Sequence, residues 1–464
     1  MNSPSSGDTS AAARPAGGRL AHLRTLAAGK GLLGRFVYMV MSQGVTLLIG
    51  LAYWMVTTRS IATHEVGYAA AAVSTAVFVS ALGALGLGTL LLAEIGHLPK
   101  CEQRPLVVMG LLITGIVALT LALATWALSP FLGQSLRHIG ENPLDATLFI
   151  VGTVLTCTCA LFDMAAIGLR KGLAQLVRNA VASALRVALV LAAVWIGQRT
   201  ATALLVAWAV ALAVSLVASW TLLDLEPGEP GWNSARATWD LVSRYWTASL
   251  RHHVLNLSIT SVTYLLPVLA ALLLVPEDYA YYAVAQLVSA SVLLLPALIA
   301  MSLFAEAKGD DALLRSNIRR TLPVGLAFCG LILALFEPAA RIALSIFGEQ
   351  YAVNGTTTLR ILLLSGVPYV VKDHYVAIRR AQDQLTKAAR IIAVATGFEI
   401  AAAAAGAALF GLVGLCAFWV GATAIEAMFF APTVWRTTIH HPPDAESTDP
   451  PSAGSDATTT PTAG

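Results

Sequence analysis

Charged side chains are scarce in this chain of 464 residues. Asp, Glu, Lys and Arg together make up 12% of the sequence, about half the share found in soluble domains, while hydrophobic residues make up 57%. Apolar runs of about 20 residues, each long enough to cross the hydrocarbon core of a bilayer, recur from one end of the chain to the other. The composition excludes a soluble globular protein and predicts an all-α polytopic membrane protein.

Motifs of catalysis are also missing. The chain has no GxxxxGK[ST] sequence, so it does not hydrolyse ATP through a P-loop. No loop beside an apolar run carries the paired acidic residues of a glycosyltransferase. The longest loops predicted on the outer face, about 130–143 and 347–357, are too short for a folded polymerase domain. We therefore predict no enzyme activity, no catalytic residues and no cofactor, and expect secondary transport with H⁺ or Na⁺ as the candidate coupling ion.

Cysteine is used sparingly, and its five positions show no pairing pattern. The spacing of Cys157 and Cys159 does not fit a zinc site, so both are interpreted as small packing residues and no metal site is predicted. Residues 1–33 lack a short apolar segment that ends in a small-residue cleavage site. No removable signal peptide is therefore predicted.

What the sequence does contain is a series of twelve apolar segments between two polar tails. The tails, 1–33 and 437–464, have compositions typical of disorder, and we expect both to be cytoplasmic. The predicted spans are 34–58, 66–96, 105–129, 144–169, 173–197, 200–223, 247–274, 279–305, 321–346, 358–380, 386–409 and 411–436. An even number of spans places both termini on the same side of the membrane.

The distribution of positive charge orients these spans. With both termini in the cytoplasm, 21 of the 29 Lys and Arg residues fall in inner segments or at the inner ends of spans, and 5 fall in outer segments or at the outer ends of spans, as the positive-inside rule requires. The remaining three, Arg186, Arg251 and Lys372, lie within predicted spans. We therefore expect a multi-pass protein of a bacterial inner (plasma) membrane with both termini cytoplasmic.

The two halves of the chain resemble each other. IGLRKGLAQL at 167–176 aligns with VAIRRAQDQL at 376–385 without a gap, and shorter matches recur in the same order about 210 residues apart. Six spans in each half give both halves the same orientation in the membrane. We predict two pseudo-symmetric six-helix bundles, 34–223 and 247–436, that rock around a substrate held between them.

Residues 224–246 form the predicted linker between the halves. Trp232, Trp239 and Trp246 recur there every seven residues. This pattern fits a helix on the inner membrane interface with its indole rings at the level of the lipid headgroups. It fits equally well a hinge segment packed on the protein.

Several of these segments resemble a known family. The stretch 57–95, TTRSIATHEVGYAAAAVSTAVFVSALGALGLGTLLLAEI, is similar to the first signature of Wzx-type polysaccharide flippases, in which an Arg ends a span and a small-residue helix containing LGLG follows. Segments 344–371, 377–400 and 410–428 are similar to the C-terminal half of that family. The resemblance covers nearly all of 34–436.

This resemblance implies a fold and a cargo. The fold is the V-shaped twelve-helix transporter of the MOP superfamily, which also includes the MATE drug exporters and the lipid II flippase. The implied cargo is an isoprenoid-pyrophosphate-linked oligosaccharide, flipped from the inner to the outer leaflet. Membrane lipids and polysaccharide-assembly enzymes are then the expected partners, with no nucleic acid partner and a monomeric protein.

Basic side chains within the spans are the candidate substrate ligands. A charge that faces lipid costs about 2.5–3.5 kcal/mol, so such side chains usually face the interior of the bundle. Arg186 lies too deep in its span to reach the interface easily. Arg251 either lines the cavity with His252 and Asn256 or extends to the inner interface. Lys372 is a further candidate cation.

Acidic side chains within the spans are candidates for energy coupling. Burial raises the pKa of a carboxyl group and so permits proton exchange, although pairing with Arg186 or Lys372 explains such residues equally well. The candidates for ion coupling or ion pairing are Asp163, Asp373, Glu399 and Glu426.

Other functions stay open at this point. Basic residues deep in the spans favour an anionic cargo over the cationic drugs of a MATE-type drug/cation antiporter, but that antiporter and a lipid II flippase are both alternatives. A membrane enzyme of polysaccharide assembly is a remote one.

Overall fold

Helices are the only regular elements in the part of the chain that is described. The computed structural model describes residues 49–226, 232–304, 311–382 and 384–439. The predicted tail at 1–33, most of the first predicted span and residues 440–464 lie outside the described residues.

The first half of the chain begins with a helix over residues 49–60. Seven α-helices follow: α3 (Thr63–Gly83), α4 (Leu87–Glu94), α5 (Lys100–Leu128), α6 (Gln134–Glu141), α7 (Pro143–Gly168), α8 (Gly172–Trp195) and α9 (Ala201–Trp220). Two of their starts follow the rules for helix caps. The side chain of Asn142 accepts a hydrogen bond from the Leu144 N–H ahead of α7, and Thr200 caps α9 in the same way.

The second half contains six helices: α10 (Trp232–Leu273), α11 (Pro276–Phe304), α12 (Asp311–Ser345), α13 (Glu349–Leu364), α14 (Gly366–Ala381) and α15 (Leu385–Ile439). α15 is broken at Phe410 and Gly411, where Gly411 has a φ of 60°. Its two arms then meet closely, because a Cβ added to Gly406 would lie 2.2 Å from the carbonyl oxygen of Gly414. The break falls where the last two predicted spans were expected to separate.

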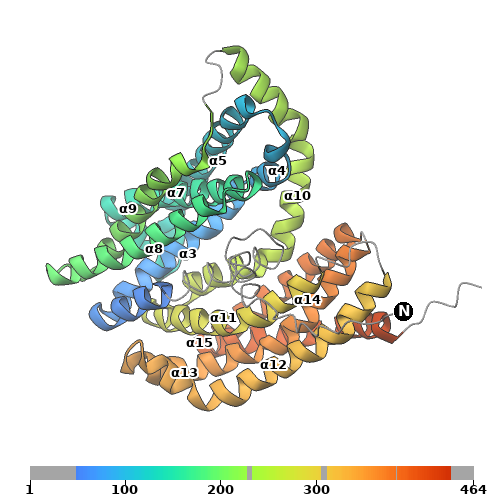
Figure 1. The fold of residues 1–464 in the computed structure, drawn as a ribbon. Coiled ribbons are helices and arrows are strands. Elements are labelled where there is room, and N and C mark those ends of the chain that lie inside the picture. Colours follow the sequence, from blue (N-terminus) through green and yellow to red (C-terminus); the bar gives the residue numbers. More distant parts are fainter. Residues whose placement is uncertain (1–48, 227–231, 305–310, 383, 440–464) are drawn as a thin grey trace, which may run out of the picture.

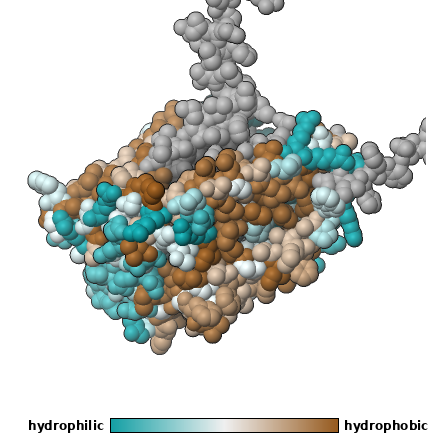
Figure 2. All heavy atoms as spheres, turned by 90° about the horizontal axis from the view of Figure 1, so that it is seen from below, coloured by the Kyte–Doolittle hydropathy of each residue, from teal (hydrophilic) through white to brown (hydrophobic). Residues whose placement is uncertain are grey.

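The helices have the length and the surface of membrane spans. Within the described residues, eight helices are long and apolar enough to cross a bilayer, or nine if the bent α10 counts as one span. On α12, Val324, Leu331, Leu335 and Ile342 are each at least 50% exposed. Figure 2 shows a broad apolar surface flanked by polar residues. The chain is therefore a multi-pass membrane protein.

The described residues do not establish the predicted number of twelve spans. Among the eight candidate spans, α13 and α14 together count as one, and the two arms of α15 together count as one. The first predicted span begins outside the described residues.

The loops expected on the outer face are largely helical, which corrects the sequence interpretation. Residues expected to form a loop at 130–143 contain α6, and most of those at 347–357 belong to α13. α6 is strongly amphipathic, and it buries Leu136 and Ile139 while its charged residues stay accessible. α6 is a short helix, whereas α13 packs along α11 and α12 and forms one candidate membrane span together with α14.

The second predicted span, 66–96, is also corrected, because it consists of two helices. Leu85 and Gly86 adopt positive φ angles of 48° and 75° between α3 and α4. The α10 helix contacts this break, where Ser249 Oγ donates to the Leu85 carbonyl at 3.4 Å and His253 Nε2 lies 3.3 Å from the Leu82 carbonyl. These contacts use backbone oxygens that the interrupted helix leaves free.

The helices form two bundles. In Figure 1, α3 to α9 lie above and α11 to α15 below, while α10 runs between them. α10 packs on α3, α4, α5 and α6 of the first bundle and on α15 of the second, and it bends by 60° between Val242–Ser258 and Thr260–Leu273. The bundles approach each other where α3 packs along α11 and diverge toward the opposite end.

The end of the molecule at which the two bundles approach each other is called the joined end. Hydrogen bonds between the bundles and a close backbone contact at a glycine hold it together. Arg59 Nε donates to the Ile346 carbonyl at 2.8 Å, and Thr63 Oγ1 donates to Gln350 Oε1 at 2.8 Å. Ser135 Oγ donates to the Leu274 carbonyl at 2.9 Å. A Cβ on Gly67 would lie 1.9 Å from the Pro276 carbonyl oxygen, so only glycine permits this approach of α3 to α11.

Candidate functional site

Two chambers lie inside the molecule on either side of α11. The first, of about 270 Å³, is called the Arg186 chamber, and the second, of about 310 Å³, the Asp373 chamber. Gln286 and Ala290 of α11 line both. The two chambers are therefore neighbours, one mainly in the N-terminal bundle and one in the C-terminal bundle.

Arg186 extends from α8 into the first chamber, whose walls come from the helix 49–60, α3, α9, α10 and α11. Its guanidinium carbon lies 5.5 Å from the centre of the Tyr53 ring, within the range of a cation–π contact. Arg186 Nε is buried without a hydrogen-bond partner, and Arg186 forms no ion pair within the described residues.

A second polar atom in this chamber is also without a partner. Tyr282, which is 1% exposed, has a buried hydroxyl that makes no hydrogen bond. Buried polar groups normally find partners, since leaving one unsatisfied costs about 1–3 kcal/mol. Unused donors on Arg186 and Tyr282 match an anion that accepts hydrogen bonds.

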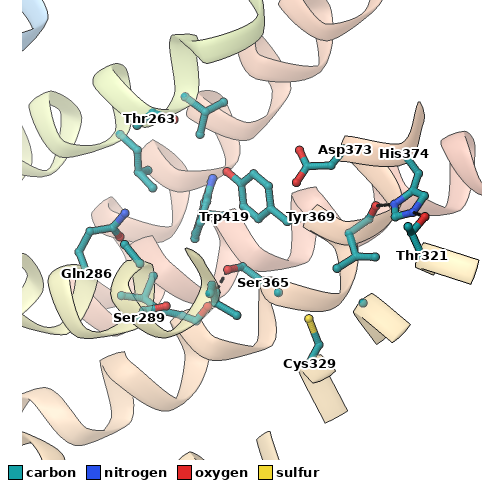
Figure 3. Close-up of a pocket in the computed structure, with 18 residues that line it drawn as sticks. Thr263, Gln286, Ser289, Thr321, Cys329, Ser365, Tyr369, Asp373, His374 and Trp419 are labelled. Carbon is teal, nitrogen blue, oxygen red and sulfur yellow. Dashed lines mark hydrogen bonds between the residues drawn. The ribbon is translucent and has the colours of Figure 1, made fainter. Parts of the chain in front are cut away.

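The Asp373 chamber combines aromatic rings with polar groups, as Figure 3 shows. Asp373 and Tyr369 come from α14, and Trp419 comes from the second arm of α15. Asp373 is exposed to the chamber, and no ion pair to it is formed by the described residues. The next residue, His374, lines the same chamber together with Thr321, with 2.9 Å between His374 Nε2 and Thr321 Oγ1.

Lys372 does not face either chamber but forms a buried triad with Glu399 and Glu426. Its ammonium group contacts Glu399 Oε1 and lies 3.0 Å from Glu426 Oε2. The indole N–H of Trp419 donates to Glu399 Oε2 at 2.8 Å. Glu426 Oε1 has no partner. With both carboxylates ionised, the triad carries one net negative charge and joins α14 to both arms of α15.

Asp163 pairs with a residue that was not among the candidates. Arg178 Nε and Nη2 donate to its two carboxylate oxygens at 2.6 Å and 2.5 Å. Asp163 therefore pairs with Arg178 and not with Arg186 or Lys372, the two partners considered from the sequence. Arg178 lies two turns before Arg186 on α8, and the turn between α7 and α8 places it opposite Asp163.

The polar group on α10 lies apart from both chambers. Arg251 is exposed, and neither chamber is lined by Arg251 or Asn256. Asn256 Nδ2 lies 3.5 Å from Thr89 Oγ1 of α4. The side chain of His252 lies outside the described residues. The roles proposed for these three residues in substrate binding stay predictions.

Sequence reasoning missed the side chains that complete the chambers. Gln286, Tyr282, Tyr369 and Trp419 lie in apolar runs, where aromatic residues are ordinary packing residues. Only Gln286, a lone amide in the middle of an apolar segment, offered a signal.

The comparisons with known proteins agree with this architecture. Residues 32–225 match the family described as polysaccharide biosynthesis protein. The sequence matches no curated protein significantly.

Three solved structures illustrate the fold that the chain shares. An inward-facing multidrug resistance MATE family transporter of the MOP superfamily superposes with a TM-score of 0.64 at 13% identity, covering 84% of this chain and 95% of its own. The lipid II flippase MurJ, in an inward closed conformation, gives a TM-score of 0.64 at 9% identity, covering 87% and 90%. A MOP superfamily transporter from Pyrococcus furiosus gives 0.58 at 13% identity, covering 87% and 95%.

Proposed function

We propose that this chain, which has the fold of the MOP transporters and matches the polysaccharide biosynthesis protein family over residues 32–225, flips a lipid-linked oligosaccharide across the membrane. The cargo is an isoprenoid-pyrophosphate-linked polysaccharide precursor, which moves from the inner to the outer leaflet. One observation carries the proposal: Arg186 stands in a chamber beside the other bundle with a buried, unused donor and no acidic partner among the described residues.

The physical problem of such a transporter is the polar headgroup. The isoprenoid tail can stay in lipid, but the pyrophosphate and the sugars must cross a layer that contains no water. Charge-assisted hydrogen bonds from a guanidinium to phosphate oxygens replace the lost hydration. Arg186 and the Tyr282 hydroxyl supply such donors, and the Tyr53 ring holds the guanidinium in place.

Transport then follows from alternating access. The joined end is the outer end in this proposal, so the structure represents a form closed to the outside. Opening it requires the contacts of Arg59 and Thr63 with α12 and α13 to break while the bundles approach at the opposite end. We propose that both termini lie in the cytoplasm of a bacterium and that the protein works as a monomer.

Energy coupling is assigned to the Lys372 triad. Glu426 has one free carboxylate oxygen, and the triad binds α14 to both arms of α15, so a proton or Na⁺ at Glu426 would change how these helices pack. H⁺ or Na⁺ is the coupling ion in this proposal. Asp163, held by Arg178, serves as a structural ion pair instead.

The first test compares Arg186→Gln with wild type in proteoliposomes that contain a fluorescent lipid-linked oligosaccharide. Loss of a charge-assisted hydrogen bond of about 1.5–3 kcal/mol predicts a flipping rate lower by about 10- to 100-fold. Arg199→Gln, which removes an equal charge from an exposed turn, is the matched control and keeps the wild-type rate. Equal rates for wild type and Arg186→Gln would sink the proposal.

A multidrug antiporter is the second candidate, because the unpaired carboxylate of Asp373 could hold a cationic drug in the second chamber. The same proteoliposomes decide between the two functions. Uptake of a cationic dye driven by an ion gradient, lost in Asp373→Asn but kept in Arg186→Gln, would favour the antiporter. Flipping of the anionic lipid, lost in Arg186→Gln, favours the flippase.

A further inference from the structure

The side chains that line the Asp373 chamber differ in charge from those that line the Arg186 chamber. Its polar groups include one carboxylate, from Asp373, and the hydroxyl groups of Thr263, Ser289 and Ser365. Two aromatic rings, Tyr369 and Trp419, complete the wall with their centres 6.0 Å apart. The Arg186 chamber, in contrast, offers a cation and a phenol.

No described residue forms an ion pair with the Asp373 carboxylate, although Lys372 and Arg380 act on it electrostatically. Lys372 precedes it in the chain, but the ammonium group of Lys372 is held by Glu399 and Glu426 on α15. Successive residues on a helix point about 100° apart, so α14 turns Lys372 toward α15 and leaves Asp373 on the chamber side. The carboxylate therefore remains a free acceptor within the chamber.

The two rings contribute apolar surface to the chamber wall. The indole N–H of Trp419 is already bound to Glu399, so it is not available to a ligand. Trp419 is only 4% exposed and Tyr369 is partly exposed, so most of the accessible ring surface beside the carboxylate and the hydroxyl groups comes from Tyr369. A pyranose matches this combination, because its C–H groups pack on a ring while its hydroxyl groups donate to a carboxylate.

We propose that the Asp373 chamber binds the first sugar of the cargo, beside the pyrophosphate in the Arg186 chamber, and selects a neutral or amino sugar over an acidic one. This inference rests on the proposed function. Gln286 and Ala290 border both chambers, so a head that spans α11 at this point has its phosphates on one side and its sugar on the other.

Size and charge set the selectivity. A chamber of about 310 Å³ lies at the lower limit of ligand pockets, which run from about 300 to 1,000 Å³, so it suits one or two sugar rings rather than a whole oligosaccharide. An acidic sugar would bring a second carboxylate against Asp373, which forms no ion pair with the described residues. Like-charge contacts of this kind are strongly unfavourable.

The test measures binding to the full chain in lipid nanodiscs. The probes are farnesyl pyrophosphate and two derivatives in which the pyrophosphate carries an N-acetylhexosamine or a hexuronic acid. Wild type binds the N-acetylhexosamine derivative at least about tenfold more tightly than the hexuronic acid derivative. Asp373→Asn, which keeps the shape of the side chain, brings the two affinities to within about twofold. Asp240→Asn, on the exposed first part of α10, is the matched control and retains the preference.

A second variant keeps the test decisive if Asp373→Asn folds poorly. Trp419→Phe keeps an aromatic ring but loses indole surface, and it weakens binding of the two sugar-bearing probes without changing that of farnesyl pyrophosphate. An unchanged preference in Asp373→Asn, or a Na⁺- or pH-dependence that disappears in it while the sugar preference stays, overturns the sugar site and leaves the flippase intact. Failure of wild type to bind any of the three probes overturns the proposed function itself.

Discussion

At the scale of single residues, ionic side chains inside the membrane differ in what they contact. The Asp163–Arg178 pair is satisfied within the protein, and the Lys372 triad leaves one oxygen of Glu426 without a partner. Arg186 and Asp373 face chambers without an ion pair among the described residues. The proposals on substrate binding therefore rest on Arg186 and Asp373, and the proposal on energy coupling rests on the triad.

The Lys372 triad predicts a large loss of stability when its cation is removed. Lys372→Met leaves Glu399, which is fully buried, and Glu426 without a positive partner. Removing one partner of a buried ion pair costs about 3–5 kcal/mol, so thermal unfolding of the purified protein shifts down by several degrees. The triple variant K372M/E399Q/E426Q recovers much of this loss. A melting temperature of Lys372→Met equal to that of wild type contradicts the structural role.

At the scale of helices, the breaks decide how the bundles meet. Gly86 lies at the break between α3 and α4, and Gly411 lies at the break within α15. Each has a positive φ angle that residues other than glycine rarely adopt. The long α10 extends from one bundle to the other, with Ser249 on the break after α3 and Ser261 bound to Thr396 of α15 at 3.1 Å. α10 therefore contacts both bundles, which remain two separate groups of helices.

The close contact between α3 and α11 predicts that replacing Gly67 by a larger residue disturbs the packing of these two helices. Gly67→Ala places a methyl group against the Pro276 carbonyl at a distance that no structure tolerates, so α3 must move away from α11. The joined end then loosens, and a cysteine introduced at Thr63 becomes more accessible to a polar thiol reagent. Gly330→Ala on α12, where the added methyl group meets open space, serves as the control and leaves accessibility unchanged. Equal labelling in both variants would refute the tight contact.

At the scale of the whole molecule, the two bundles are joined at one end and diverge toward the other (Figure 1). This arrangement resembles the inward-facing MATE transporter and the lipid II flippase in overall fold, at identities of 13% and 9%. In the proposed function, alternating access requires the joined end to separate once in each cycle.

Cross-linking the joined end tests this cycle. Thr63 Oγ1 and Gln350 Oε1 lie 2.8 Å apart on opposite bundles. A Thr63→Cys/Gln350→Cys pair, treated with a short bifunctional thiol reagent, holds the bundles together and reduces flipping to background. Cleavage of the cross-link restores the rate, and each single variant treated alike stays active. A cross-linked protein that flips at the uncross-linked rate would contradict alternating access through this end.

The distribution of apolar and charged residues was enough to predict an all-helical, multi-pass protein, because a segment without charges has no stable place except in lipid or in a core. It also identified Arg186, Lys372, Glu399 and Glu426 as unusual, since charges inside apolar runs are costly wherever they lie. α6 and the first part of α13 were missed because short segments with polar residues look like loops, whereas residues 358–364 of α13 lie in the predicted tenth span.

What the sequence by itself determined, then, is which segments enter the membrane and which of their residues cannot face lipid. Only the tertiary structure decided the ion-pair partners. Asp163 pairs with Arg178, and Lys372 pairs with Glu399 and Glu426. Within the described residues, Arg186 and Asp373 have no ion-pair partner. The reason is geometric. Burial is local and can be read along a chain, whereas an ion pair forms between helices whose rotation and approach are set by packing, here by close contacts such as Gly67 on Pro276.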